Sequence, residues 1–583
     1  MIIHFIALAL AAAVGIAALW EKSLPAEEKT LCFLVYFLPF LGGGFSSASW
    51  AVTICALLLL LGWFERRRGK LAVPCNDTFL TLLLLTVCSG ISVFWAVDRG
   101  MAVWGIIRYV PVVLFGLVLV QLPPERRQKV WMLVPLSGVV MTILSGIGQY
   151  FPEMAQQYTV AGRLAGFFEY PNTFAAYLLT GLVISVFAED RNKRAWLGDT
   201  ILICGVLASG SRTVFLMMIV VLLLLVLLHR KKKAWLGLLA ALLIGFGAVA
   251  ALSILGHNHI LDRLLSISLK SSTFLGRLLY FRDALPVIRS HPLGLGYMGY
   301  HALQGSFQTG VYSVAHVHNG ILQLFLDVGW VPAIAMIYVF LRGFFQKGGS
   351  HVGRLVMLVL LGHSLFDFDM EFLPVWLVLL PALHWEDGVT FRLRGSRVLR
   401  ILGVLLAGIC LWLAAGDSLF RAGKMDLALK VTPFHTQALE YRLTQLRDAE
   451  ELDAAADRLL NLNSSSRLGH SAKANAAYAS GDVAAMVAEK KTAIRCARYD
   501  LEEYCDYFRK LNDYLLRYRE QGDSRSAEIC ASLLLEIPGL LEQVRQETTS
   551  QAWMLDDVPQ LELPAQYQKR LAEIASLYTV PAK

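Results

Sequence analysis

The chain has 583 residues, of which 56% are hydrophobic and 17% are charged. Both fractions differ from those of an ordinary soluble domain, in which about 25% of the residues are charged. The apolar residues gather in blocks of about 15 to 22 residues, the length of helix that crosses a hydrocarbon core of about 30 Å. The composition therefore excludes an ordinary soluble protein and predicts an all-α, polytopic membrane protein.

The apolar blocks predict about 14 membrane-spanning helices. The first block is interpreted as one span among many rather than as a removable signal peptide. In chain order the predicted spans cover residues 2–19, 31–45, 48–64, 78–97, 101–122, 130–150, 172–188, 196–209, 213–228, 234–255, 319–345, 355–366, 372–384 and 398–415.

Clusters of Lys and Arg predict the orientation of these spans, because cationic loops stay in the cytoplasm. The clusters follow every second span, at residues 65–70, 123–129, 189–194, 229–233, 342–354 and 391–397. Both termini are then extracytoplasmic, together with the loops around Asp98 and at 151–171, 210–212, 257–318 and 367–371. The net charge of +8 is interpreted as this topology signal, and no binding to nucleic acid is expected.

The chain changes character after residue 416. Residues 417–583 carry charges throughout and space Ala and Leu by three and four positions, a pattern typical of amphipathic helices. Stretches such as "AYASGDVAAMVAEKKTAI" resemble tetratricopeptide units, and a plain antiparallel helical bundle is the alternative. We therefore predict a membrane domain at 1–416 and an extracytoplasmic helical domain at 417–583, in which Cys496, Cys505 and Cys530 leave one disulfide possible.

Arginines on the predicted outer side are unexpected, because positive charge normally marks the cytoplasmic loops. Arg163, Arg212, Arg277 and Arg282 all lie there. One interpretation is that each side chain reaches to lipid headgroups. The other is that their guanidinium groups together bind a phosphate-rich ligand.

The outer loop 257–318 adds a predicted amphipathic helix in "TFLGRLLYFRDALPVIRSHP". Its leucines share one side, while Arg277 and Arg282 lie off it. A Pro/Gly turn follows the helix. We expect such a loop to fold back over the membrane and form a wall of a site at the interface; an ordinary amphipathic connector is the alternative.

The stretch "AHVHNGILQLFLDVGW", residues 315–330, places His316 and His318 at the head of an apolar run. A metal site, a catalytic base, a proton relay and a polar helix cap are the candidate roles. A zinc site would need further ligands, and the other histidines of the loop, His257, His259, His291 and His301, show no diagnostic spacing. No metal site is therefore predicted.

These motifs resemble the O-antigen ligase/polymerase superfamily. His318, Asn319, nine residues and Gly329 match its signature, although Pro332 departs from the position that follows. "RLAGFFEYPNTFAAYL", "SGSRT", "GRLLYFRDALPVIRSHPLGLG" and "GHSLFDFD" resemble its other segments, in the expected order over about residues 80 to 385.

The resemblance implies a glycosyltransferase that uses undecaprenyl-diphosphate-linked glycans outside the cytoplasmic membrane, without a metal or other cofactor. It implies His318 as the base and Arg212 and Arg277 on the diphosphate. Asn319 would orient His318 or bind the sugar. The full set of implied substrate-binding residues is Arg163, Arg212, Arg277, Arg282, Asn319 and Asn172. His363 and Asp367 are candidates for the acceptor path, with a structural hydrogen-bonding role as the alternative.

Two other functions stay open. A transporter or flippase of lipid-linked or anionic substrates would be expected to show internal repeats and ionisable groups at mid-membrane. A scaffold for polysaccharide-assembly proteins, bound through 417–583, would leave the outer arginines unexplained. Within the enzyme hypothesis, a polymerase and a ligase need the same donor site, so the acceptor is open between a glycan, a lipid and a protein.

Overall fold

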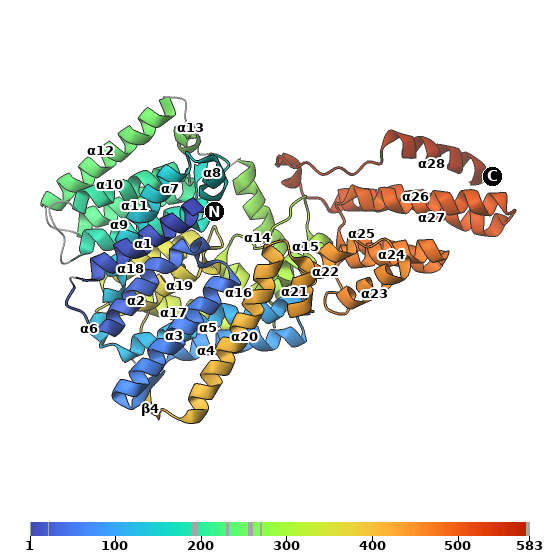
Figure 1. Ribbon diagram of the computed structural model, residues 1–583. Helices are drawn as coiled ribbons and strands as arrows, with labels where there is room; N and C mark the ends of the chain where they lie inside the picture. Colours follow the sequence, from blue (N-terminus) through green and yellow to red (C-terminus); the bar gives the residue numbers. More distant parts are fainter. Residues whose placement is uncertain are drawn as a thin grey trace.

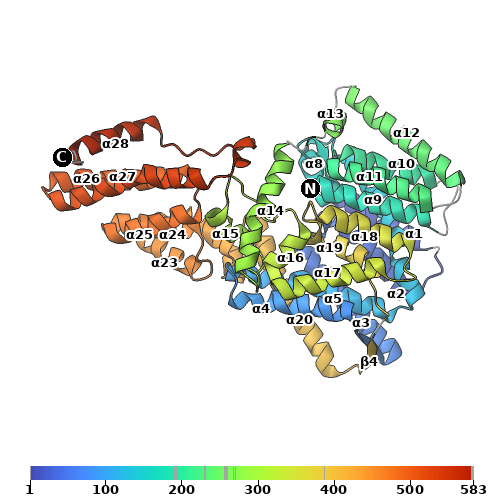
Figure 2. The same ribbon diagram turned by 180° about the vertical axis from the view of Figure 1, so that it is seen from behind.

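The computed structural model describes residues 2–20, 22–188, 195–228, 232–254, 260–266, 268, 271–386 and 388–578. A thick helical body is followed by an extension of paired helices that projects to one side (Figure 1). Figure 2 shows the same two parts from behind, with α14 and α15 lying between them.

Six segments of the described chain are long and apolar enough to cross a membrane. They are Ile3–Trp20, Ser47–Arg68, Asp77–Phe94, Arg99–Gln121, Pro124–Gly148 and Arg397–Arg421. The helices that form them are α1 (Ile2–Trp20), α3 (Ser47–Arg68), α4 (Asp77–Ile91), α5 (Arg99–Gln121), α7 (Val134–Gly148) and α20 (Arg397–Arg421). A polytopic, nearly all-α membrane protein is therefore confirmed in outline.

The predicted count of about 14 spans is not confirmed. The remaining apolar segments of the described chain are 10 to 17 residues long. A helix of 16 residues extends only about 24 Å, which is less than the hydrocarbon thickness. These segments belong to α9 (Pro171–Phe187), α10 (Ala195–Ala208), α11 (Arg212–Leu228), α12 (Lys232–Ile254), α17 (Trp330–Phe345), α18 (His351–Ser364) and α19 (Leu373–Leu379).

Shorter elements connect these helices. The connecting helices are α2 (Ala26–Phe37), α6 (Pro124–Arg127), α8 (Pro152–Tyr158), α13 (Ile260–Leu265), α14 (Ser272–Ser290), α15 (Gly299–Phe307) and α16 (Gly320–Val328). Two small antiparallel sheets pair β1 (Lys70–Cys75) with β4 (Val389–Arg394), and β2 (Thr159–Val160) with β3 (Arg163–Leu164). These strands are at most six residues long and were not predicted from the sequence.

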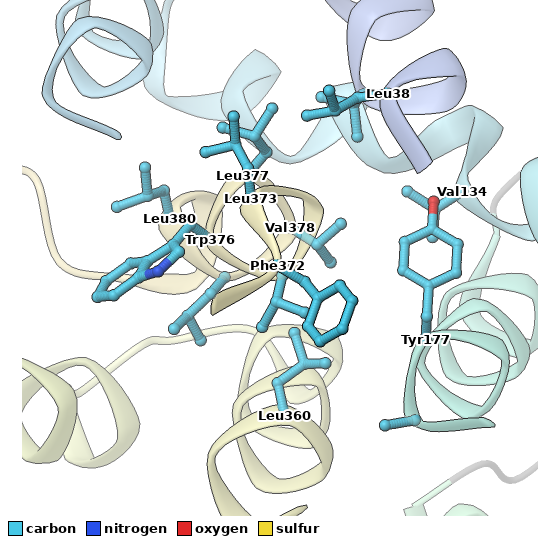
Figure 3. Close-up of a cluster of buried hydrophobic side chains, with 14 of the residues drawn as sticks. Leu38, Val134, Tyr177, Leu360, Phe372, Leu373, Trp376, Leu377, Val378 and Leu380 are labelled. Atoms are coloured by element: carbon cyan, nitrogen blue, oxygen red, sulfur yellow. The ribbon is translucent and has the colours of Figure 1, made fainter. Parts of the chain in front are cut away.

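The centre of the body is the short helix α19, all of whose residues are buried. Figure 3 shows Trp376 and Val378 of this helix among side chains from several neighbouring elements, including Tyr177 and Leu360. A helix that is apolar on every side must lie inside the protein rather than on its surface. The body therefore packs around the segment that directly follows the 367–371 loop.

The predicted cytoplasmic loops gather at one end of the body. Arg68 donates a hydrogen bond to the carbonyl oxygen of Gln121 at 2.6 Å, and Ser350 donates one to the Gln128 side chain at 3.0 Å. Strand β1, after the first cationic cluster, pairs with β4, which contains part of the last. Residues 189–194 and 229–231 of the other cationic loops lie outside the described residues.

The predicted outer loops gather at the opposite end. His4, at the start of α1, lies 3.3 Å from the Tyr158 hydroxyl, and the Val97 amide donates to the Leu295 carbonyl at 3.0 Å. The two sets of loops are thus segregated as the positive-inside pattern requires. Which end faces the cytoplasm stays a prediction.

The extension consists of α21 (Met425–Val431), α22 (Thr436–Leu443), α23 (Ala449–Leu460), α24 (Arg467–Ser480), α25 (Val483–Cys496), α26 (Leu501–Glu520), α27 (Ser524–Glu547) and α28 (Ala565–Tyr578). Gly481 ends α24 with a φ of 81°, and the Asp482 side chain caps α25. The sequence therefore encodes helical hairpins, but a tetratricopeptide fold is not confirmed. Cys496, Cys505 and Cys530 are free.

The extension is bound to the outer loop and to the start of α5. The Arg498 amide donates to the Gly305 carbonyl at 3.2 Å, and Gln551 donates to the Leu275 carbonyl at 2.6 Å. Thr436 donates a hydrogen bond to Asp98 at 2.7 Å. These contacts fix the extension beside α14 and α15, close to the segment that contains His318.

Candidate functional site

A single carboxylate, that of Asp367, joins several of the predicted site residues. Its side chain is fully buried in the loop between α18 and the 3-10 helix η6 (Asp369–Glu371). It accepts hydrogen bonds from Tyr170 and Asn172 at 2.8 Å and from Arg277 at 2.9 Å. The Nδ1 atom of His318 lies 3.2 Å from its Oδ1. Four segments far apart in the sequence thus meet at one buried anion.

These partners keep Asp367 ionised. Burial by itself would raise the pKa of this carboxyl, but Arg277 and the hydrogen bond from His318 outweigh it and hold the pKa well below its usual range. A permanent negative charge beside Nδ1 favours the tautomer of His318 that carries its proton there. Nε2 then keeps a free lone pair.

His318 is held by local backbone structure. It has a φ of 55°, in the left-handed region that non-glycine residues rarely adopt. Asn319 follows as the N-cap of α16, where its Oδ1 accepts from the amides of Ile321 and Leu322, and its Nδ2 donates to the Leu365 carbonyl at 2.9 Å. Asn319 therefore ties His318 to the loop of Asp367. The His318 side chain stays 20% exposed, and no described residue bonds to Nε2.

Arg163 is a second arginine that contacts this cluster. Its Nε donates to the Ser209 carbonyl at 2.8 Å, and its Nη2 donates to Asn172 Oδ1 at 2.5 Å. Burial, together with the nearby positive charge of Arg263, lowers the pKa of Arg163 to about 10. A buried guanidinium that lacks a full negative counter-charge is suited to bind an anion.

A cavity of about 270 Å³ lies beside this cluster. Its walls contain four arginines, and its described lining contains no carboxylate; the arginines are Arg163, Arg212, Arg263 and Arg277. Residues 210–213, at the N-terminus of α11, also line it. Unpaired amides and the helix dipole make such an end attractive to negative charge. The composition of the cavity therefore favours an anionic ligand.

The site residues predicted from the sequence lie in a hydrogen-bonded cluster, in the cavity wall, or apart from both. Arg163, Asn172, Arg277, His318 and Asp367 form one hydrogen-bonded cluster, and Arg212 lines the cavity and donates to the Ser266 carbonyl at 3.3 Å.

Arg282 and His363 lie apart from that cluster. Arg282 is exposed on α14, and no described hydrogen bond joins it to the site. His363 is fully buried, 2.6 Å from Asp369, and lines none of the described cavities. In α14, Leu278 and Leu285 are exposed, whereas Ala284 and Val287 contribute to the buried side, so the predicted apolar side was partly wrong.

Tyr170 and Arg263 were missed by the sequence analysis. Tyr170 stands two residues before Asn172 in the aromatic stretch that was singled out, and Arg263 is one more arginine of the outer loop. Counting all outer arginines would have found Arg263. No sequence signal distinguishes Tyr170 from its aromatic neighbours.

His316 and His318 do not face a common ligand position. His318 is directed to Asp367, whereas His316 Nδ1 lies 3.8 Å from Glu371, which pairs with Arg108. Phe368 packs against both rings, with centroid distances of 5.3 and 4.9 Å. His257 and His259 lie outside the described residues.

A family model described as O-antigen ligase matches residues 197–337. The resemblance to the O-antigen ligase/polymerase superfamily is confirmed. The matched segment runs from α10 into α17 and includes Arg212, Arg277 and His318. No curated protein matches the chain. The superfamily match indicates an activity of the O-antigen ligase/polymerase type in general, which implies a membrane glycosyltransferase acting on lipid-linked glycan.

Proposed function

We propose that this protein transfers or polymerises an undecaprenyl-diphosphate-linked glycan on the outer side of the cytoplasmic membrane, and that His318 is its general base. The observation that carries the proposal is the His318–Asp367 pair next to a cavity walled by arginines. The outer location follows from the charge pattern of the loops, with both termini on the same side.

The diphosphate of the donor occupies the arginine cavity. Arg277 and Arg163 lie nearest to the Asp367 cluster, while Arg212 and Arg263 line the same cavity at the N-terminus of α11. Guanidinium groups bind phosphate oxygens in pairs. As the glycosidic bond breaks, these charges stabilise the negative charge that develops on the leaving undecaprenyl diphosphate.

In the proposed transfer, His318 rather than a metal-bound base accepts the proton of the acceptor hydroxyl. Nε2 of His318 removes the proton from the acceptor hydroxyl, whose oxygen forms a bond to the anomeric carbon of the donor sugar. The bond from that carbon to the diphosphate oxygen breaks, and the electron pair leaves with undecaprenyl diphosphate. Asp367 holds the imidazole orientation and stabilises the imidazolium that forms, as a carboxylate does in other histidine-based sites.

A transporter remains the alternative, and one observation bears on it. Arg108 is an ionisable residue inside the span α5, as transporters often require. Arg108 is, however, 4% exposed and paired with Asp327 and Glu371, and it lines none of the described cavities. The groups that face the arginine cavity lie instead at the end of the body where the predicted outer loops gather, which favours the enzyme.

Purified protein incubated with a defined undecaprenyl-diphosphate oligosaccharide, with and without candidate acceptors, tests the proposal. We expect wild type to consume the donor and His318→Ala to do so about 10²–10⁴-fold more slowly, the usual contribution of a general base. His291→Ala, in the same outer loop, is the matched control. A wild type that never consumes the donor, or a fully active His318→Ala variant, refutes the proposal.

A further inference from the structure

A second cavity is lined by Ala315 and His316, in the segment that also contains His318. Its volume is about 160 Å³, and it is enclosed by the outer ends of α3, α5 and α20, by the loop before α15 and by α22 of the extension. None of its lining residues lines the arginine cavity. The body and the extension thus build this cavity together.

The walls of this cavity combine aromatic rings with a few polar groups. Phe45, Trp50, Trp104 and Tyr297 supply the aromatic surface. The polar groups are Ser47, His316, Asp417, Arg421 and Gln437. Apolar walls with a small number of oriented polar groups are typical of small-molecule sites. A sugar ring has matching chemistry, since its C–H faces pack on aromatic rings and its hydroxyls donate and accept hydrogen bonds.

Some polar groups of the cavity lack protein partners. His316 is buried, and its Nδ1 has no hydrogen-bond partner among the described residues. Gln437 likewise has no described partner, although its amide can both donate and accept. Buried polar groups are normally satisfied, so the unpaired Nδ1 of His316 indicates that a ligand or water completes it, and the half-buried amide of Gln437 is free to bind the same ligand.

The charge of this cavity differs from that of the arginine cavity. Its single arginine, Arg421, donates from Nε to Asp417 at 3.0 Å, and Ser47 donates to the same carboxylate at 2.5 Å. The Asp417 charge offsets that of Arg421 and repels phosphate. The second cavity therefore favours an uncharged polar ligand over a diphosphate.

A larger cavity of about 560 Å³ adjoins this one, because Met101, Met298 and Gln437 line both. His301 of the outer loop and Glu440 of the extension line its further part. Its volume falls within the range of about 300–1,000 Å³ that is usual for ligand pockets. The two cavities together offer a path for more than one sugar residue.

We propose that these two adjoining cavities form the acceptor subsite, and that they take uncharged sugar residues of a carbohydrate acceptor. The inference rests on the proposed function and sharpens it. Phe368 packs against His316 on this side and against His318, while Arg277 and Phe366 line the arginine cavity. The Phe368 ring thus connects the proposed acceptor subsite, which His316 lines, to the proposed base His318.

Binding of a sugar without lipid or diphosphate tests this directly. The probe is the free oligosaccharide released from undecaprenyl diphosphate by mild acid, observed by saturation-transfer NMR with the full-length protein in detergent. We expect Gln437→Leu and Arg421→Gln each to weaken binding about tenfold or more, because hydrogen bonds to the sugar are lost. Gln445→Leu is the control, since Gln445 is exposed in the same region and lines none of the described cavities.

The outcomes separate the subsite from the proposed function. Weakened binding in Gln437→Leu with unchanged binding in His318→Ala supports the subsite, even where donor transfer fails. In the transfer assay the same variants should raise the KM for acceptor and leave the KM for donor unchanged. No binding to wild type, equal binding to Gln437→Leu, or displacement of the probe by a short polyprenyl alcohol overturns the inference.

Discussion

Two clusters of the same residue types lie next to each other in this protein. In one, Arg277 pairs with Asp367, which also contacts His318. In the other, Arg108 pairs with Asp327 at 2.5 Å and with Glu371, whose carboxylate lies near His316. The histidines are two residues apart and the loop carboxylates four, so neither composition nor sequence position separates the clusters.

The clusters differ in whether the arginine lines a cavity and in the charge state of the carboxylates. Arg277 lines the arginine cavity and His318 is 20% exposed, whereas Arg108 is 4% exposed and Asp327 and Glu371 are each 2% exposed. Arg277 and His318 hold the pKa of Asp367 far below its usual range, but burial outweighs Arg108 and raises the pKa of Glu371 to about 7. We infer that the Asp367 cluster performs chemistry and that the Arg108 cluster holds together the helices and loops around it.

Asp367→Asn should have the largest effect on activity. The side-chain amide no longer stabilises an imidazolium, and it can turn its NH₂ toward Nδ1 and so place the proton of His318 on Nε2. We expect donor consumption to fall about 10²–10⁴-fold in the transfer assay, with unchanged elution on gel filtration. Turnover near that of wild type would contradict the proposed difference between the two clusters, because Asp367 would then have only a structural role, like Glu371.

Arg277→Lys should have the next largest effect. Lysine keeps the charge but loses the planar fork that binds phosphate oxygens in pairs. We expect kcat/KM for the donor to fall about 10- to 100-fold in steady-state kinetics. Arg282→Lys, five residues further along α14 and exposed, is the matched control and should stay within about twofold. Equal losses in both variants would mean that the outer arginines act only through general surface charge.

Arg108→Met should act on stability rather than on a chemical step. It leaves Asp327 and Glu371 buried without their cation, and breaking a buried pair typically costs about 3–5 kcal/mol. Thermal unfolding in detergent should therefore show a much lower midpoint. The triple variant Arg108→Met, Asp327→Asn, Glu371→Gln removes all three charges and should recover most of the loss. A stable Arg108→Met protein without transfer activity would instead assign this cluster to catalysis.

The sequence predicted the membrane class, and it drew attention to three arginines that line one cavity, because apolar block length and Lys/Arg bias are local properties of the chain. The resemblance supplied His318 in the same way, through a contiguous motif. The motif did not show that Asp367 contacts most of the other residues of the site. Its partners Asn172 and Arg277 stand 195 and 90 residues earlier in the chain, and only the packed body brings them together.

The contacts of Arg108 could likewise not be predicted from the sequence, because its partners are even further away along the chain. Arg108 lies in the apolar block at 101–122, which was predicted as a plain span, while its partners Asp327 and Glu371 follow 219 and 263 residues later. Hydropathy averages conceal a single charge among twenty apolar residues. The predicted span count is not confirmed for a related reason, since apolar helices that pack around the buried α19 need not be long enough to cross a membrane.

His316→Gln should give the smallest effect on stability, visible as a change in the pH dependence of unfolding. Burial and the charge of Arg108 lower the pKa of His316 to about 3, whereas an unfolded histidine has a pKa near 6.5. Between these values the unfolded chain binds the proton and the folded protein does not. Acidification below about pH 6.5 therefore favours unfolding through this residue, by up to about 1.4 kcal/mol per pH unit.

Glutamine does not titrate, so the variant should lose less stability than wild type between pH 7.5 and pH 5. Thermal midpoints in detergent at both pH values measure the difference, and the buried carboxyls contribute equally to both proteins. An identical pH dependence would mean that His316 reaches solvent or is already protonated in the folded state. The contrast between the buried ion pairs of Arg108 and the accessible Arg277–Asp367 pair would then not extend to the histidines, because His316 would take up protons as readily as a solvent-exposed imidazole.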